Sequence, residues 1–121
     1  MKLSVILPCY NVGRFVRLCL DSLAEAFALS SIDDYEIIVV DDGSSDDTAD
    51  VVMQTGCKNL RLFKQENCGV SGARNRGLAE AHGRWVWFVD PDDTVVPDIL
   101  QKISHLLDSS YQAIAFGFNL C

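Results

Sequence analysis

Three carboxylates, those of Asp90, Asp92 and Asp93, lie within four residues of the chain. At neutral pH they repel one another, which favours either a bound cation or a raised pKa. Mg²⁺ and Mn²⁺ prefer oxygen ligands and complete their shell with water and substrate phosphates, so one or two of these carboxylates suffice. The competing interpretation is a solvated acidic turn that caps the helix expected after Pro97.

A second acidic pair, Asp41 and Asp42, stands directly before Gly43. A carboxylate at this position can accept hydrogen bonds from the imide of a pyrimidine or from a ribose, and the glycine permits a tight turn. Asx turns and helix caps are the ordinary alternative between a strand and a helix. Tyr10 offers an aromatic face on which a base can stack, although plain packing with the hydroxyl in water explains it equally simply.

The glycine-rich segment from Asn67 to Asn75 leads into a predicted helix. N–H groups at a helix start can cradle phosphate, and Arg74 can add a forked donor. Alternatively, the segment is a loop whose Arg74 pairs with a neighbouring carboxylate. His82 and His105 are expected at exposed helix positions, away from other candidate ligands, so we interpret both as surface residues.

Short apolar runs, separated by segments of helical periodicity, are typical of buried strands. We predict strands at Leu3–Leu7, Tyr35–Val40, Leu60–Phe63, Trp85–Val89 and Gln112–Phe118. The helices predicted between them are Val12–Ala28 after Asn11 as cap, a short helix capped by Ser45 or Asp46 and stopped by Gly56, one that contains Ala73 to Ala81 and is ended by Gly83, and one from Pro97 to Leu107. This alternation predicts an α/β fold with a mostly parallel sheet and helices on both of its faces.

Three of the segments that could take part in binding or chemistry follow predicted strand ends, at positions 8–11, 41–46 and 90–93. Ligands of open α/β sheets bind outside the carboxyl ends of the strands, so these segments are expected to share one crevice. The aromatic residues Trp85 and Trp87, together with Phe88, lie within a strand and are expected in the core.

Length and composition describe one globular domain, because 121 residues with 49% apolar and 22% charged residues can bury a core without staples. The net charge of -7 argues against a non-specific nucleic-acid surface. Five cysteines without ligand spacing are read as free thiols of a cytoplasmic protein. No apolar run approaches the roughly 20 residues that cross a bilayer, and membrane association is an alternative only for the full-length protein.

In order along the chain, four segments resemble family 2 glycosyltransferases. They are Ser4–Asn11, Glu36–Thr48, Asn67–Gly69 with Ala73–Asn75, and Asp90–Asp93. The resemblance covers nearly the whole chain and implies the A-type glycosyltransferase fold, a Rossmann-like nucleotide-binding sheet. It also implies a nucleotide diphosphate sugar as donor, a UDP-sugar in our interpretation, and a divalent metal, Mn²⁺ or Mg²⁺.

The resemblance also assigns roles by position. Pro8 and Tyr10 would border the base, Asp42 would bond the uracil imide, and Asp41 would support its loop. Asp90 and Asp92 match the DxD motif of the family, with Pro91 in place of the usual small residue. The nucleotide-binding residues that we expect are Pro8, Tyr10, Asn11, Asp41, Asp42, Gly43, Asn67, Gly69, Arg74 and Asp90, and the candidate metal ligands are Asp92, Asp93 and Asp90.

Members of this family usually continue with an acceptor-binding region that supplies the catalytic base. We therefore expect residues 1–121 to be a single donor-binding domain truncated from a longer glycosyltransferase, with the base beyond Cys121 and little or no transfer by this piece alone. The full protein is expected to transfer its sugar, with inversion, to a carbohydrate or lipid-linked acceptor in polysaccharide or glycoconjugate synthesis.

Two other classes of protein fit the sequence less well. A phosphoacceptor receiver domain has this length and alternation, but it needs acids at the end of the first strand and a late lysine, whereas the first strand here ends in Pro8. A dinucleotide dehydrogenase would carry GxGxxG after that strand, and this motif is missing. A nucleotide-binding module without catalysis remains the closer alternative.

Overall fold

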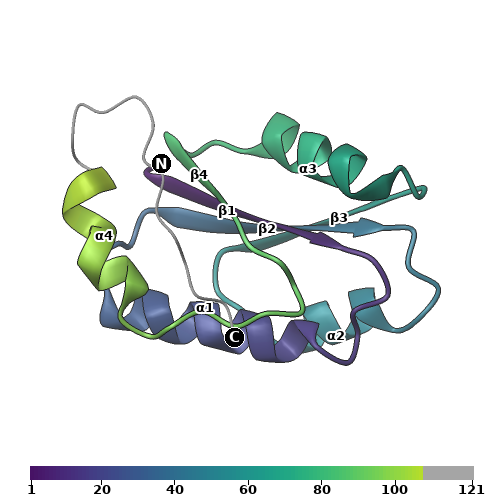
Figure 1. The fold of residues 1–121 in the computed structure, drawn as a ribbon, viewed down its shortest axis with the longest axis horizontal. Coiled ribbons are helices and arrows are strands. Elements are labelled where there is room, and N and C mark those ends of the chain that lie inside the picture. The colour runs from purple at the N-terminus through teal and green to yellow at the C-terminus, as the bar shows by residue number, and fades with distance from the viewer. Residues whose placement is uncertain (108–121) are drawn as a thin grey trace.

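Four strands form a parallel sheet in the order β3-β2-β1-β4. The strands are β1 (Leu3–Cys9), β2 (Tyr35–Asp42), β3 (Leu60–Gln65) and β4 (Trp85–Phe88). All three pairings are parallel, and Leu3 of β1 stands opposite Tyr35 of β2 and Trp85 of β4. The computed structural model describes residues 1–107 (Figure 1), so the strand predicted at Gln112–Phe118 lies outside the described residues.

Helices cover both faces of this sheet, as predicted. The helices are α1 (Val16–Leu29), α2 (Thr48–Gln54), α3 (Gly69–Glu80) and α4 (Ile99–Leu107). Figure 1 shows α3 alone on one face and α1 with α2 on the other. None of the helices within residues 1–107 has the length and apolarity needed to cross a bilayer.

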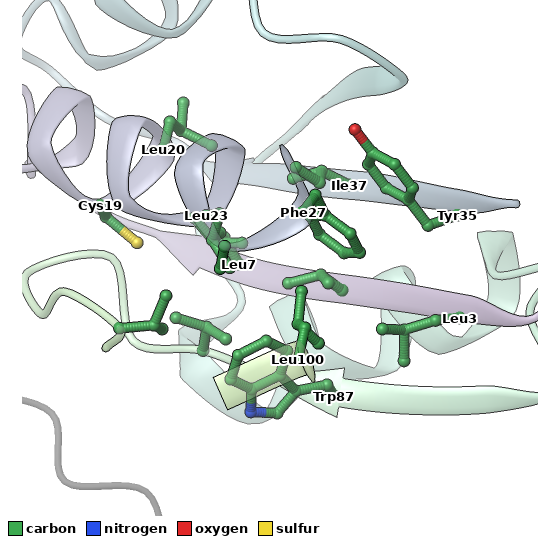
Figure 2. Packing of buried hydrophobic residues seen from close by; sticks show 14 of the residues in the cluster. Leu3, Leu7, Cys19, Leu20, Leu23, Phe27, Tyr35, Ile37, Trp87 and Leu100 are labelled. Atoms are coloured by element: carbon green, nitrogen blue, oxygen red, sulfur yellow. The ribbon is translucent and has the colours of Figure 1, made fainter. Parts of the chain in front are cut away.

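The larger core lies between the sheet and α1, with α4 completing it (Figure 2). Side chains of a strand alternate between the two faces, so Val5 and Leu7 enter this core while Ile6 enters the smaller core under α3. The rings of Phe27 and Tyr35 stack with centroids 3.6 Å apart. Trp87 is 4% exposed, which confirms its predicted place in the core.

The contact between α3 and the sheet is unusually close at Gly77. A Cβ atom on this residue would overlap Cγ2 of Ile6, a fully buried side chain of β1. Ala73, one turn earlier on the same face, is also buried. Small residues therefore let α3 lie directly on β1 and β2, and this fixes where its N-terminus comes to rest.

The helix starts differ from the prediction. Helix α2 begins at Thr48 after Asp47, and α3 begins at Gly69, within the glycine-rich segment and not after it. Helix α1 begins at Val16 and not at Val12, because Val12 opens a turn whose carbonyl accepts the N–H groups of Phe15 and Val16. Asn11, the predicted cap, has a positive φ of 52° and turns its side chain to another loop. Helix α4 likewise begins at Ile99, two residues after Pro97.

Candidate functional site

A pocket of about 210 Å³ opens at the carboxyl ends of β1 and β2, beside the first turn of α3. Its wall includes five of the residues predicted to bind a nucleotide, and it also contains three residues that were not predicted. The predicted ones are Pro8, Tyr10, Asp42, Asn67 and Gly69, and the others are Cys9, Val70 and Ala73. Two of the three segments predicted to share a crevice, those at the ends of β1 and β2, therefore meet here together with the start of α3, whereas no residue of 90–93 lines this pocket.

Asp42 is the buried anion of this pocket, with 3% of its surface exposed. Its Oδ1 accepts hydrogen bonds from Nε2 of Gln65 at 2.9 Å and from the N–H of Cys68 at 2.8 Å. Its backbone carbonyl accepts a bond from Nδ2 of Asn67 at 3.1 Å. Among residues 1–107, both bonds to the carboxylate end on Oδ1, so Asp42 is held in place while Oδ2 can accept a donor from a ligand.

Tyr10 stands at the mouth of the same pocket with 52% of its surface exposed. Its ring is therefore accessible to a ligand in the pocket, which the apolar residues Val70 and Ala73 also line. A flat ligand with one apolar face and an N–H edge suits this combination of an aromatic ring, aliphatic contacts and a fixed carboxylate.

Asp41 points to the other side of the sheet from Asp42, because neighbouring residues of a strand alternate. Its Oδ1 accepts the N–H of Ser44 at 3.1 Å, so this side chain supports the turn after β2. Asp41 and Gly43 line a separate polar pocket of about 310 Å³ together with Lys64. Gly43 itself has φ of 78°, and a Cβ there would lie 2.8 Å from the backbone nitrogen of Asn67.

Asn11 joins the loops that follow β1 and β2, and it does not line the pocket of Asp42. Its Oδ1 accepts the N–H of Ser45 at 2.8 Å, and its own N–H donates to Oγ of Ser44 at 2.9 Å. Asp46 tightens the same junction by accepting the N–H groups of Gly13 and Thr48. Hydrogen bonds hold the pKa of Asp46 below its ordinary value, and the bond from the Thr48 hydroxyl contributes most.

Arg74 lies on α3, and its side chain reaches the end of β4. Its Nη2 is 3.9 Å from Oδ1 of Asp90, and its guanidinium stands 5.8 Å from the centre of the Phe88 ring. The pairing with a neighbouring carboxylate, one of the two interpretations of Arg74, is thus present. Both side chains remain about half exposed, at 44% and 55%, so the pair is weak and accessible to an anion.

The carboxylates of Asp90, Asp92 and Asp93 are neighbours in an exposed turn, closed by a 3.1 Å bond from the Asp93 N–H to the Asp90 carbonyl. Desolvation, followed by the negative charges of Asp92 and Asp90, raises the pKa of Asp93. The solvated turn of the alternative interpretation is present, but these acids do not cap α4, which begins only at Ile99.

The carboxylates of Asp90, Asp92 and Asp93 could hold a divalent metal only with additional ligands from a bound molecule. Within residues 1–107, no three acidic, histidine or cysteine side chains converge as a ready-made cage. Mg²⁺ and Mn²⁺ need only one or two carboxylates when substrate phosphates supply other ligands. The residues therefore fit a metal that arrives with a phosphorylated ligand.

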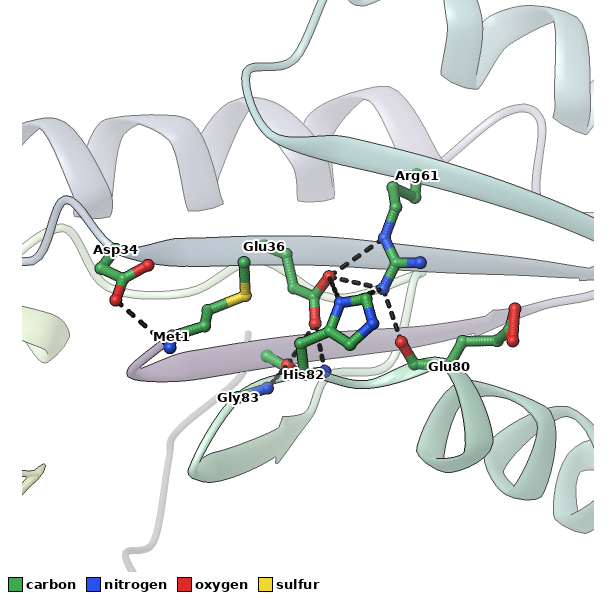
Figure 3. Close-up of polar contacts among 8 residues, drawn as sticks. Met1, Asp34, Glu36, Arg61, Glu80, His82 and Gly83 are labelled. Carbon is green, nitrogen blue, oxygen red and sulfur yellow. Dashed lines mark hydrogen bonds and ion pairs between the residues drawn. The ribbon is translucent and has the colours of Figure 1, made fainter.

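A buried polar network lies near the start of β2, at the other end of the strand from the pocket (Figure 3). It was not predicted from the sequence. Glu36, 3% exposed, accepts hydrogen bonds from Ser4 at 2.6 Å, from the His82 N–H at 2.7 Å and from Arg61 at 2.6 Å. Arg61 also donates to the carbonyl of Glu80, at the end of α3. The available signal was a glutamate within an otherwise apolar strand, which demands partners when buried.

His82 was placed wrongly by the sequence analysis. It follows α3 and does not lie on the helix, and its exposed ring stands 3.4 Å from Arg61 and 3.7 Å from Glu36. His105 is exposed on α4, as expected. The four cysteines within the described residues are free thiols.

The strand order, the parallel sheet and a pocket at its carboxyl edge define a Rossmann-like nucleotide-binding domain, with the fold of the nucleotide-diphospho-sugar transferases. More particularly, the glycosyl transferase family 2 model matches residues 4–119, and the chain belongs to that family.

Relatives and solved structures agree with this assignment. The chain is 39% identical over 104 residues to the uncharacterized glycosyltransferase YibD of Escherichia coli K12, which covers 84% of this chain and 29% of the relative. It superposes with a TM-score of 0.79 and 34% identity on S. aureus TarS 1-349 in complex with UDP-GlcNAc, covering 89% and 31% of the two chains. The mannosyltransferase PcManGT from Pyrobaculum calidifontis, in complex with GDP-Man and Mn²⁺, gives 0.79 and 27%, covering 90% and 33%. The chain thus spans about a third or less of each of these proteins.

Proposed function

We propose that this chain is the donor-binding part of a glycosyltransferase that uses a nucleotide diphosphate sugar, with a UDP-sugar as the donor. The observation that carries the proposal is the pocket in which Tyr10, Asp42 and Asn67 meet. Family membership and the nucleotide sugars held by the similar TarS and PcManGT structures support the same class of ligand.

Within this proposal the base lies against Tyr10 and Pro8, and Oδ2 of Asp42 accepts the imide N–H of uracil. A uracil ring suits this acceptor because its imide nitrogen carries a hydrogen, whereas the corresponding ring nitrogen of cytosine is itself an acceptor. The segment Asn67 to Asn75 closes over the nucleotide, and Gly69 lets its backbone approach the ligand. Asn11, Asp41 and Gly43 act indirectly by holding the loop after β2.

The diphosphate end of the donor lies toward Asp90, Asp92 and Asp93. Asp90 and Asp92 form the DxD motif, and Asp93 competes with Asp92 as the direct ligand of Mn²⁺ or Mg²⁺. When bound, the metal supplies positive charge that stabilises the leaving diphosphate. Arg74, already beside Asp90, adds a second positive group on the side of α3.

Acceptor binding and activation are proposed for a part of the protein outside these 121 residues. An acceptor in polysaccharide or glycoconjugate synthesis, a carbohydrate or lipid-linked molecule, would be activated by a base beyond Cys121, and transfer would proceed with inversion. We propose that the protein works in the cytoplasm and that residues 1–121 alone bind donor without efficient transfer. Donor binding without transfer is also the prediction of the binding-module alternative, so a catalytic assay of the longer protein separates the two.

Calorimetric titration tests the donor class directly. We expect UDP to bind to the chain more tightly with MnCl₂ than with EDTA, and more tightly than GDP or CDP under either condition. Equal affinities for the three nucleotides would contradict the assignment of Asp42 to the uracil imide. A donor panel on the longer protein, read by mass spectrometry of the product, then identifies the sugar.

A further inference from the structure

Residues 90–95, which we call the acidic loop, are held mainly through their backbone, whereas the carboxylates of the loop have few partners. Upstream of it, the N–H of Val89 donates to the carbonyl of Ile6 in β1 at 3.0 Å. The side chains of Asp90 and Asp92 are exposed, and the contact between Asp90 and Arg74 spans 3.9 Å. The loop therefore presents exposed carboxylates on a main chain held by hydrogen bonds, and two residues of α1 supply some of these bonds.

Ser22 holds the far end of the acidic loop. Its hydroxyl donates to the carbonyl of Cys19 at 2.7 Å, which settles where the hydroxyl hydrogen points. A lone pair of the same oxygen then accepts the N–H of Val95 at 3.1 Å. Ser22 is thus a directed acceptor that connects α1 to the last residue of the loop.

Cys19 holds the near end. It is fully buried on the inner side of α1, where Figure 2 shows its sulfur pointing from the helix toward the sheet, and its Sγ lies 3.7 Å from the carbonyl oxygen of Asp90. Burial, followed by the negative charges of Asp93, Asp92 and Asp90, raises the pKa of Cys19 to about 12. The sulfur therefore stays a thiol that can donate to this carbonyl, which also accepts the N–H of Asp93.

We propose that Ser22 and Cys19 are positioning residues for metal-assisted diphosphate binding, because together they set where the acidic loop presents its carboxylates. The inference rests on the proposed function and adds α1 to the parts of the fold that determine metal dependence. Neither residue lines the nucleotide pocket, so their contribution is separable from recognition of the base.

Ser30, the residue that follows α1 as its C-cap, provides a matched control. Its hydroxyl donates to the carbonyl of Phe27 at 2.9 Å and accepts the N–H of Ile32 at 3.2 Å, which repeats the bonding pattern of Ser22. It lies at the opposite end of α1, away from the acidic loop. Ser30→Ala therefore removes an equivalent pair of hydrogen bonds without touching the loop.

The test is a set of UDP titrations, in EDTA and in MnCl₂, of the unaltered chain and its Ser22→Ala, Cys19→Ala and Ser30→Ala variants. We expect Ser22→Ala and Cys19→Ala each to reduce the Mn²⁺-dependent gain in affinity by about three- to tenfold, the effect of one lost hydrogen bond. Their affinities in EDTA, and both affinities of Ser30→Ala, should match those of the unaltered chain.

Two results would overturn the inference while leaving the proposed function intact. One is an unchanged Mn²⁺-dependent gain in both Ser22→Ala and Cys19→Ala. The other is an equal loss of affinity in EDTA and in MnCl₂, which would mean that the substitutions only loosen the fold. If the unaltered chain binds UDP without any gain from Mn²⁺, the metal role fails and the inference fails with it. If it does not bind UDP at all, the proposed donor class is wrong.

Discussion

Asp41 and Asp42 are adjacent in sequence but serve different pockets, because they occupy opposite faces of β2. Asp42 faces the pocket beneath α3 and is oriented by Gln65 and by the N–H of Cys68. Asp41 instead receives the N–H of Ser44 and shapes the turn. Substitutions of these two acids should therefore have different consequences, a direct one at Asp42 and an indirect one at Asp41.

Replacing Asp42 with asparagine should weaken UDP binding by about 1.5–3 kcal/mol, the range for a hydrogen bond to a charged group. The amide removes the negative charge and brings an NH₂ group toward the imide N–H of the base. Calorimetry with UDP measures the change. Asp33→Asn, an exposed acid before β2, is the matched control and should leave the affinity unaltered. Wild-type affinity in Asp42→Asn would show that the base lies elsewhere.

The double substitution Asp92→Asn with Asp93→Asn should abolish the dependence of UDP binding on Mn²⁺. Amide oxygens are weaker ligands for hard cations than carboxylates, so both candidate ligands lose most of their attraction for the metal. Titrations in EDTA and MnCl₂ give the two affinities to compare. Retention of the full Mn²⁺ effect would move the metal to other residues.

Among the elements, α3 connects the sheet to the pocket. Its N-terminal residues Gly69, Val70 and Ala73 line the pocket, and Gly77 allows the helix to lie against Ile6. The position of the pocket wall thus depends on a contact at Gly77, one turn beyond the lining residue Ala73.

Gly77→Ala should lower the free energy of unfolding by about 1–3 kcal/mol, the usual cost of forcing an extra methyl into a packed core. The gain of helix propensity, roughly 1 kcal/mol, works in the opposite direction but does not remove the overlap with the buried Ile6. Urea denaturation measures the difference. Ser71→Ala, at an exposed position of α3, is the control and should change the stability by less than about 0.5 kcal/mol. A more stable Gly77→Ala protein would mean that α3 can shift outward.

The sequence predicted this framework well because strands and helices here obey their local periodicity. Four of the predicted strands and the parallel, two-faced arrangement are confirmed. Three pocket residues, Pro8, Tyr10 and Asp42, were expected from their positions at strand ends, and Asn67 and Gly69 from the glycine-rich segment. The network of Glu36 and the anchoring of residues 90–95 by Ser22 did not follow, since both depend on contacts between residues far apart in sequence. The early start predicted for α1 failed because Asn11 adopts a left-handed conformation to reach Ser45.

Across the whole molecule, Glu36 connects more elements than any other polar side chain described above. It joins β2 to β1 through Ser4, to β3 through Arg61, and to the loop after α3 through His82. Burial alone would raise the pKa of Glu36, but the hydrogen bonds from Ser4, the His82 N–H and Arg61 outweigh it and hold the pKa below its ordinary value.

This lowered pKa predicts how stability depends on pH. A carboxyl group with a folded-state pKa below its unfolded value, which is about 4.3 for glutamate, contributes stability above that value and loses it as pH falls through the folded-state pKa. We expect Glu36→Gln to be less stable than the unaltered chain at pH 7, by about 1–3 kcal/mol. The difference should shrink below about pH 4. Urea denaturation across this range measures it, and a difference that does not vary with pH would contradict the role of the charge.

The alternation of Asp41 and Asp42 has a consequence for changes of chain length. A one-residue insertion or deletion inside β2 reverses the face of every residue that follows it in the strand, so it would turn Asp41 into the pocket and Asp42 beneath the turn. Substitutions in β2 alter one side chain at a time, whereas an indel would exchange the two carboxylates at once. Transposon or deletion scanning of the longer protein should therefore find β2 closed to single-residue length changes even where its individual side chains can be replaced.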